Sequence, residues 1–164
     1  MAVLDVLIYP NSALRVEASE IIDWDGGLKK LITDMWETMY TSKGVGLAAP
    51  QVGVSKRLIV IEYEGERHVV INPRIIEEEG FERADEGCLS FPGIYESVER
   101  PAKIHVIYRD ETGSQRDEVI DGFLARVFAH EIDHLSGRLF IDRLSPLKKS
   151  FIRQKMERQA NGRS

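Results

Sequence analysis

His130-Glu131-Ile132-Asp133-His134 is the segment around which the rest of the chain can be interpreted. Residues four apart lie on the same face of a helix, so both imidazoles can reach a single metal ion. The glutamate beside the first histidine can reach a water molecule on that metal. This pattern is typical of enzymes that hydrolyse an amide or an ester, and it predicts a metallohydrolase.

The sequence around this motif predicts that it lies in a buried helix. Asp121 is a candidate N-cap, because its carboxylate can accept hydrogen bonds from the backbone N–H groups of the first turn, and Gly137 is a natural stop. Apolar side chains occur on more than one face of the segment: Phe123, Leu124, Val127, Phe128, Ile132 and Leu135. A charged Glu131 among them is costly unless a metal, a proton or a partner compensates it. Two partly buried histidines, each bonded to a neighbour, are the alternative interpretation.

The single cysteine of the chain, Cys88, is a candidate third ligand. A catalytic metal site usually has three protein ligands and one open position, so two histidines leave it incomplete. Free cysteine also packs well as a small buried apolar residue, which is the alternative interpretation of Cys88 in isolation. As a thiolate it would complete a Cys-His-His set, and such a set suits zinc or ferrous iron.

A third segment has no charge over ten residues: 44–53, with the sequence GVGLAAPQVG. On its own it is a loop of small residues that allows close backbone packing, and it lacks the Lys-Ser/Thr of a phosphate-binding loop. Together with residues 86–90 (EGCLS) and 130–134 (HEIDH), in this order, it makes the chain resemble the peptide deformylases of bacterial type, the polypeptide deformylase family. The resemblance runs from residues 7–10 to residues 144–147.

The resemblance implies a role for each motif residue. The metal ligands would be Cys88, His130 and His134. The metal is natively ferrous iron in this family, and zinc, nickel or cobalt can replace it. Glu131 would be the general acid and base, while Gln51 and the backbone N–H of Leu89 would hold the formyl oxygen as it becomes an anion. The substrate would be contacted by Gly44, Val45, Gly46 and Leu89. One flanking difference is Ala129, where many members have glutamine.

The implied reaction removes the formyl group from N-formyl-methionine at the N-terminus of new polypeptides and releases formate, with metal-bound water as the nucleophile. Physical chemistry agrees, because a metal lowers the pKa of bound water towards ~7 and a carboxylate can move the proton. A metallopeptidase with the same helical motif is an alternative, but it leaves Cys88 and the 44–53 loop unexplained. An inactive metal-binding or ribosome-binding module would explain the ligands but not Glu131 and Gln51.

Composition indicates one soluble domain. The chain has 164 residues, of which 43% are hydrophobic and 30% are charged, and this is ordinary for a single globular domain. No apolar run approaches the ~20 residues of a membrane span, and no basic-apolar leader opens the sequence. We therefore expect a cytoplasmic protein with no membrane and no DNA partner, and the single cysteine fits that compartment. An organellar protein whose transit peptide has been removed is the alternative.

The expected fold class is α+β, with short antiparallel β-sheets packed around the buried central metal-binding helix and with N-terminal and C-terminal helices. Apolar spacing predicts the first of these helices over about residues 26–42. Strand pairs are expected at 57–62 with 68–72 and at 103–109 with 115–120, each around a glycine-containing turn. Two histidines in these strands are expected to be ordinary strand residues: His68 and His105.

The sequence divides into a catalytic domain at residues 1–147 and a basic C-terminal helix or tail of the same domain at residues 148–164. Ser145 and Pro146 favour a helix start, and Phe151 with Ile152 is expected to dock that helix on the domain. The tail has six basic side chains against one acidic one, in a chain of net charge −5. A solvated helix face is one explanation of this charge. Taken together with the family resemblance, the charge also predicts contact with ribosomal RNA near the tunnel exit.

Overall fold

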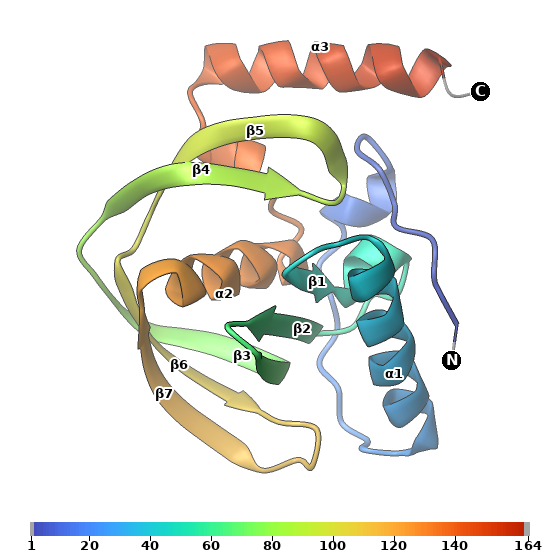
Figure 1. The fold of residues 1–164 in the computed structure, drawn as a ribbon, viewed down its shortest axis with the longest axis vertical. Helices are drawn as coiled ribbons and strands as arrows, with labels where there is room; N and C mark the ends of the chain where they lie inside the picture. The colour runs from blue at the N-terminus through green and yellow to red at the C-terminus, as the bar shows by residue number, and fades with distance from the viewer. Residues whose placement is uncertain (1, 163–164) are drawn as a thin grey trace.

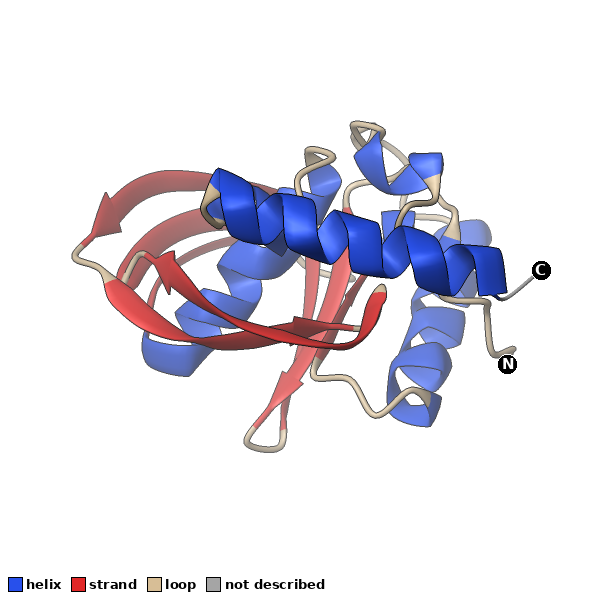
Figure 2. Ribbon diagram, turned by 90° about the horizontal axis from the view of Figure 1, so that it is seen from above, coloured by secondary structure: helices blue, strands red, loops and turns tan. Residues whose placement is uncertain are grey.

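The computed structural model describes residues 2–162 of the chain, in which helices pack on and between two antiparallel sheets (Figures 1 and 2). The α-helices are α1 (Gly26–Thr41), α2 (Gly122–Leu135) and α3 (Pro146–Gly162). The strands are β1 (Gly46–Ala48), β2 (Leu58–Tyr63), β3 (Glu66–Glu79), β4 (Glu82–Cys88), β5 (Phe91–Arg100), β6 (Lys103–Arg109) and β7 (Gln115–Asp121). Three short 3₁₀ helices complete the set: η1 (Ser12–Arg15), η2 (Ala49–Val52) and η3 (Phe140–Arg143). The predicted α+β class is confirmed.

The larger sheet has the strand order β1-β2-β3-β6-β7, and β4 pairs with β5 in a separate hairpin. Figure 1 shows α2 between that hairpin and the larger sheet, with α3 on the far side of the hairpin and α1 beside β1 and β2. The burial of β6 explains how the sheet holds α2. Ile104, Val106 and Tyr108 alternate towards the helix, where they pack with Phe128, because successive side chains of a strand point to opposite faces.

Strand β3 is longer than its sequence pattern predicted. The apolar alternation breaks at Asn72 and Pro73, so the expected strand ended there, whereas β3 continues to Glu79. The register against β6 shifts between Ile71 and Arg74, and Asn72 has a φ of +53°. A bulge is where a strand tolerates proline, because the missing N–H is not needed for the ladder.

The two ends of α2 differ in how well they were predicted. Asp121 occupies the N-cap position, but its side chain makes no capping hydrogen bond, so the predicted carboxylate cap is wrong. The N–H of Gly122 instead donates to the carbonyl of Ala102. At the other end Gly137 has a φ of +72°, and a Cβ there would lie 2.4 Å from the carbonyl oxygen of Arg15. Glycine is therefore required at this stop, as predicted.

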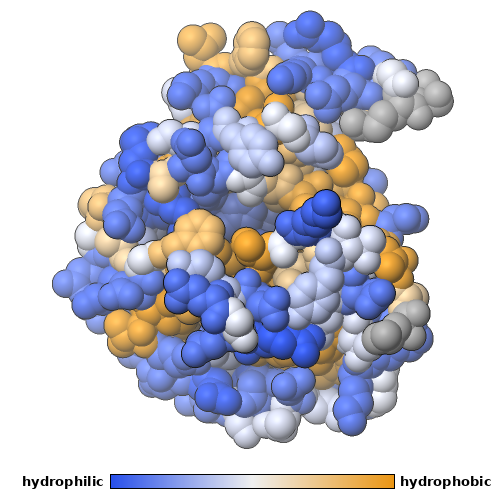
Figure 3. All heavy atoms as spheres, in the orientation of Figure 1, coloured by the Kyte–Doolittle hydropathy of each residue, from blue (hydrophilic) through white to orange (hydrophobic). Residues whose placement is uncertain are grey.

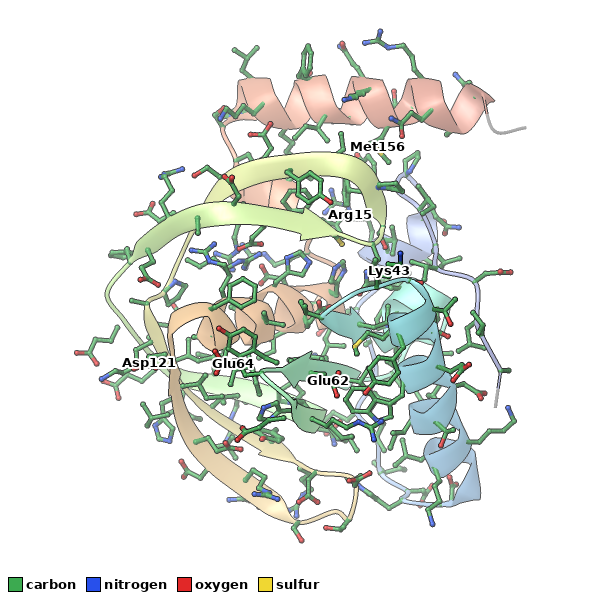
Figure 4. The ribbon with its side chains drawn as sticks, viewed as in Figure 1. Arg15, Lys43, Glu62, Glu64, Asp121 and Met156 are labelled. Atoms are coloured by element: carbon green, nitrogen blue, oxygen red, sulfur yellow. The ribbon has the colours of Figure 1, made fainter. Side chains whose placement is uncertain are left out.

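Helix α3 begins at Pro146, as predicted, but it docks through a different pair of side chains. Phe151 is 66% exposed, whereas Ile152 and Met156 are buried in the apolar cluster beneath the hairpin. These two residues are four apart and share one helix face, and Figure 4 shows Met156 on the side of α3 that faces β5. The expected apolar edge of Phe151 with Ile152 is therefore corrected. Within residues 2–162 no helix is both long and apolar enough to cross a bilayer.

Candidate active site

Three predicted ligands, far apart in the sequence, meet at one point of the fold. Cys88 ends strand β4, while His130 and His134 lie one turn apart on α2, and their ligand atoms are all within 4.8 Å of one another. The Sγ of Cys88 lies 3.4 Å from the Nε2 of His134. Both histidines are buried, so the helix supplies two ligands and the hairpin carries the third to them.

Glu86 holds the first histidine in one orientation. Its Oε1 lies 2.8 Å from the Nδ1 of His130, which leaves the Nε2 of that ring for a metal. The same carboxylate accepts hydrogen bonds from two buried guanidinium groups, those of Arg100 at 2.5 and 2.9 Å and of Arg126 at 2.6 Å. Burial alone would raise the pKa of Glu86, but the hydrogen bonds from His130 and Arg100 outweigh it and lower that pKa to about 2. Glu86 is therefore a buried anion that orients a ligand.

This charged network was not foreseen from the sequence. It continues through Asp133 on α2, whose carboxylate accepts hydrogen bonds from Arg100 at 2.9 Å and from Arg143 at 2.8 Å. Arg126 also donates to the carbonyls of Glu82 and Val98, one on each strand of the hairpin. The signal in the sequence was the charge inside an otherwise apolar helix, because a buried charge needs a partner.

The electrostatics of the three ligands favour a cation among them. Burial opposes the protonation of His130, but hydrogen bonds to Cys88 and Glu86 outweigh it and raise the pKa of His130 to about 10. Burial, followed by the charge on His130, lowers the pKa of His134 well below its usual value. His134 is therefore neutral, as a metal ligand must be, and His130 has to release its proton when a metal binds. A thiolate with two imidazoles is a donor set that suits divalent iron, zinc, cobalt or nickel, so these residues fit the metal.

Glu131 lies beside the ligands with one oxygen free. The residue is 5% exposed, and its Oε1 has no hydrogen-bond partner within residues 2–162. Burial raises the pKa of this carboxyl to about 7. A Cβ on Gly46 would lie 2.9 Å from the Oε2 of Glu131 and 3.2 Å from the Cγ1 of Val127, so only glycine fits against the carboxylate.

Two residues that carry uncharged hydrogen-bond donors, Gln51 and Leu89, also lie at this site. Gln51 is buried, and its Oε1 accepts a hydrogen bond from the N–H of Ala48 at 3.0 Å. That bond turns the Nε2 towards Ser90, whose Oγ lies at 3.2 Å, and towards the Sγ of Cys88 at 3.6 Å. The backbone N–H of Leu89 donates to no acceptor in the described part of the chain. Both groups were selected from the sequence, and the fold brings them to the same place.

A cavity of about 470 Å³ opens over the site, and its lining includes Gly44, Val45, Gly46, Leu89 and Glu131. A smaller pocket of about 140 Å³ adjoins it, with the apolar side chains of Val45, Phe123 and Val127 in its wall. Figure 3 shows a hollow between the β4–β5 hairpin and the elements below it, with apolar side chains exposed there. A larger cavity of about 940 Å³ runs along α1 beside Trp24 and Trp36, and it contains none of the predicted site residues.

The two strand histidines do not join this site. His105 pairs with Asp117 across β6 and β7 at 2.5 Å. His68 packs edge-on against Phe128, with the ring centroids 5.6 Å apart. Neither belongs to the one group of candidate metal ligands found among residues 2–162.

Comparison with known proteins agrees with this geometry. The family model described as polypeptide deformylase matches residues 3–150. The chain belongs to the polypeptide deformylase family. A peptide deformylase of Alkalilimnicola ehrlichii is 46% identical over 162 residues, which cover 96% of this chain and 91% of that protein. The crystal structure of a peptide deformylase from Legionella pneumophila matches with a TM-score of 0.92 and 42% identity, over 99% of this chain and 98% of that one. The peptide deformylase of Ehrlichia chaffeensis in complex with actinonin matches with a TM-score of 0.92 and 37% identity, over 97% and 98% of the two chains.

Family membership confirms the activity expected from the sequence. The protein is a metal-dependent hydrolase that removes the formyl group from the N-terminus of newly made polypeptides. Cys88, His130 and His134 form a possible site for the metal. The roles of the individual residues and the identity of the metal stay predictions.

Proposed function

We propose that this peptide deformylase binds ferrous iron through Cys88, His130 and His134 and uses Glu131 as its general acid and base. The observation that carries the proposal is the free, buried Oε1 of Glu131 beside the three ligands. A buried carboxylate oxygen without a partner is costly, and a base in a deformylase needs such an atom free to take a proton.

When bound, the metal supplies Lewis acidity, which makes water a nucleophile at neutral pH and polarises the formyl group. Glu131 takes the proton of the attacking water on Oε1 and passes it to the leaving amine nitrogen, because a carboxyl whose pKa is about 7 can do both. The Nε2 of Gln51 and the N–H of Leu89 donate hydrogen bonds to the formyl oxygen as it becomes negative. Each such donor lowers the barrier by roughly 3 kcal/mol in other hydrolases.

The small apolar pocket gives the substrate its direction. Val45, Phe123 and Val127 offer an apolar wall beside Glu131 in a volume of about 140 Å³, which suits one unbranched thioether side chain. The methionine side chain enters this pocket, and the formyl group faces Cys88. The rest of the peptide then leaves through the larger cavity, past Gly44 and Gly46. Ferrous iron and a thiolate ligand also require a reducing compartment, and we therefore place the protein in the cytoplasm.

One experiment tests the activity and the metal together. Protein loaded anaerobically with iron or with nickel is expected to release formate from formyl-Met-Ala-Ser and to leave internal peptide bonds uncut. In air the iron form should lose activity faster than the nickel form, because iron changes oxidation state and the thiolate can be oxidised. Cys88→Ser should weaken metal binding at neutral pH, since a hydroxyl is a poorer anionic ligand.

The controls in that experiment separate two failures. Internal cleavage without formate release would contradict the deformylase assignment and favour a metallopeptidase. Equal lifetimes of the iron and nickel forms in air would contradict iron as the sensitive component and leave the activity assignment standing. The readouts are formate released, peptide fragments by mass spectrometry, and bound metal by elemental analysis.

We also propose that the basic C-terminal segment, residues 148–164, belongs to the same domain as residues 1–147 and contacts ribosomal RNA. The contacts of Ile152 and Met156 with the hairpin cluster support the first part. Two cations of the segment are already paired, Lys148 and Lys149, with Glu96 and Asp142. The exposed cations on the described helix that remain are Arg153, Lys155 and Arg158, while Arg163 lies outside the described residues.

Replacing these three cations by glutamine should weaken ribosome co-sedimentation and flatten its dependence on salt. The variant would make fewer phosphate contacts, so its binding would release fewer counterions. Turnover of formyl-Met-Ala-Ser should stay unchanged, since the three side chains lie outside the site. A matched control removes three exposed cations elsewhere: Lys29, Lys56 and Arg74. Equal ribosome binding by the two triple variants would refute the contact through α3. Truncation is avoided because it would remove Ile152 and Met156 from the core.

A further inference from the structure

Lys43 has a backbone conformation that its side chain does not favour. It follows the C-cap of α1, Ser42, and has a φ of +60°. Its N–H donates to the carbonyl of Tyr40 at 3.1 Å, and the N–H of Gly44 donates to the carbonyl of Met39 at 3.0 Å. This is the Schellman ending of a helix, in which the left-handed position is usually glycine. A lysine held in this conformation is strained, and strain of this kind concentrates at functional sites.

The helix ending directs Lys43 to the rim of the active-site cavity. The 470 Å³ cavity that contains Cys88 and Glu131 is also lined by Lys43. The next residue is in close contact with the other wall, since a Cβ on Gly44 would lie 2.8 Å from the Cδ1 of Leu89. Figure 4 shows Lys43 at the end of α1 that faces the β4–β5 hairpin. The segment from Lys43 to Gly44 therefore forms one side of the mouth through which a bound peptide leaves.

The ammonium group of Lys43 is unpaired. Within residues 2–162 no carboxylate lies within 4.0 Å of it, and it makes no side-chain hydrogen bond. Four other lysines do have carboxylate partners: Lys30, Lys103, Lys148 and Lys149. Of the described residues that line the cavity, Lys43 is the one lysine or arginine. It places a single positive charge at the mouth of this cavity, in a protein whose net charge is −5.

We propose that Lys43 is a specificity-determining residue that favours an aspartate or glutamate in the two residues following formyl-methionine. The proposal rests on the proposed function for the direction of the peptide, with the methionine side chain in the small pocket. An extended chain advances at most about 3.3–3.6 Å per residue, so the residues just after methionine are those that pass the rim. An acidic side chain at one of these positions is attracted to the ammonium group of Lys43, whereas a basic side chain there is repelled by it.

The test compares formyl-Met peptides that differ only in the charge of one residue. Glutamate, glutamine or lysine is placed at the second or the third residue, and the C-terminus is amidated so that it carries no charge. The wild-type protein is expected to show kcat/KM about two- to fivefold higher for glutamate than for lysine at one of these positions, as exposed ion pairs allow. The difference should appear in KM rather than in kcat, and it should shrink in high salt because the rim is solvent-exposed.

Three variants separate recognition from structure. Lys43→Gln keeps a side chain at the strained position and should bring the glutamate-to-lysine ratio close to one, and Lys43→Glu should reverse it. Lys43→Gly should lose the ratio as well, yet keep or raise the melting temperature, because glycine relieves the left-handed strain. A lysine with only a structural role would not lose the charge preference while the melting temperature is kept or raised.

A matched charge control excludes a general field effect. Lys29→Gln removes the same charge from the other end of α1, about 18 Å along the helix at 1.5 Å per residue, which is beyond the ~8 Å screening length of 0.15 M salt. It should keep the wild-type ratio. An equal ratio in wild type and Lys43→Gln, or a wild-type ratio of one at both positions, would overturn the proposal. Formate release with no charge preference refutes only Lys43, whereas no formate release from any peptide refutes the proposed function.

Discussion

Glu131→Gln is expected to lower formate release by on the order of 10²-fold or more while the protein keeps its fold and its metal. Glutamine has the same shape as glutamate but cannot accept the proton of the attacking water. The ligand atoms of Cys88, His130 and His134 are not altered by the change. The loss should appear in kcat, because the proton is moved during the chemical step and not during binding.

The structure predicts that the fold survives this substitution. Glu131 is 5% exposed and its Oε1 has no hydrogen-bond partner in the described chain, so no bond to the protein is lost there. Replacing a buried ionisable group with a neutral one removes a desolvation cost, and the melting temperature should stay constant or rise. Bound metal is measured beside turnover, with Glu20→Gln as an exposed control. Near-normal turnover with metal bound would mean that Glu131 is not the base.

The predictable part of the site is the part that lies in local sequence pattern. The His-Glu-x-x-His spacing puts two ligands on one helix face, and the apolar residues around it predict that the helix is buried. The loop of residues 44–53 could be selected because ten residues without charge are unusual in a chain that is 30% charged. The meeting of Cys88 with His130 and His134 was inferred from the family motifs, since no local pattern relates positions 42 residues apart in the sequence.

The β4–β5 hairpin shows why the rest could not be predicted. Residues 82–100 contain many charges, and β4 is largely exposed, so strict apolar alternation is missing over part of this segment. Glu86 and Arg100, which both lie in this segment, resemble surface charges in the sequence. In the fold Glu86 and Arg100 are 6% and 1% exposed. These residues are buried because the fold brings them together with charged side chains on α2. Contacts of this kind depend on the tertiary structure and cannot be inferred from composition.

The second large effect is expected from Glu86→Gln, through the fold and the metal together. Glutamine leaves the buried guanidinium groups of Arg100 and Arg126 without their shared anion. Removing one partner of a buried charge network costs about 3–5 kcal/mol of unfolding free energy. At roughly 2–4 °C per kcal/mol for a protein of this size, the melting temperature should fall by on the order of 10 °C.

Metal binding should weaken in the same variant. The Oε1 of Glu86 lies 2.8 Å from the Nδ1 of His130, and a neutral amide is a weaker acceptor there than a carboxylate. Metal affinity should therefore fall by up to the roughly 10- to 100-fold that is typical when such a partner is lost. Arg126→Met gives the informative comparison, because it removes a cation that pairs with the carboxylate of Glu86 but leaves the contact of that carboxylate with His130 in place. It should destabilise the fold and leave metal affinity closer to that of the wild type. The double variant should lose less stability than the two single changes combined, since their effects share one contact.

Acid unfolding supplies an independent measure of the same network. The pKa of Glu86 is lowered from its ordinary value of 4.5 to about 2, so the unfolded chain takes up a proton at higher pH than the folded one. Stability from this group is therefore complete above about pH 4.5 and is lost as the pH falls towards 2. The wild-type protein should lose its stability advantage over Glu86→Gln across that interval in denaturant titrations. A constant difference between the two proteins from pH 7 to pH 2.5 would show that the ionised form of Glu86 is not what stabilises the hairpin against α2.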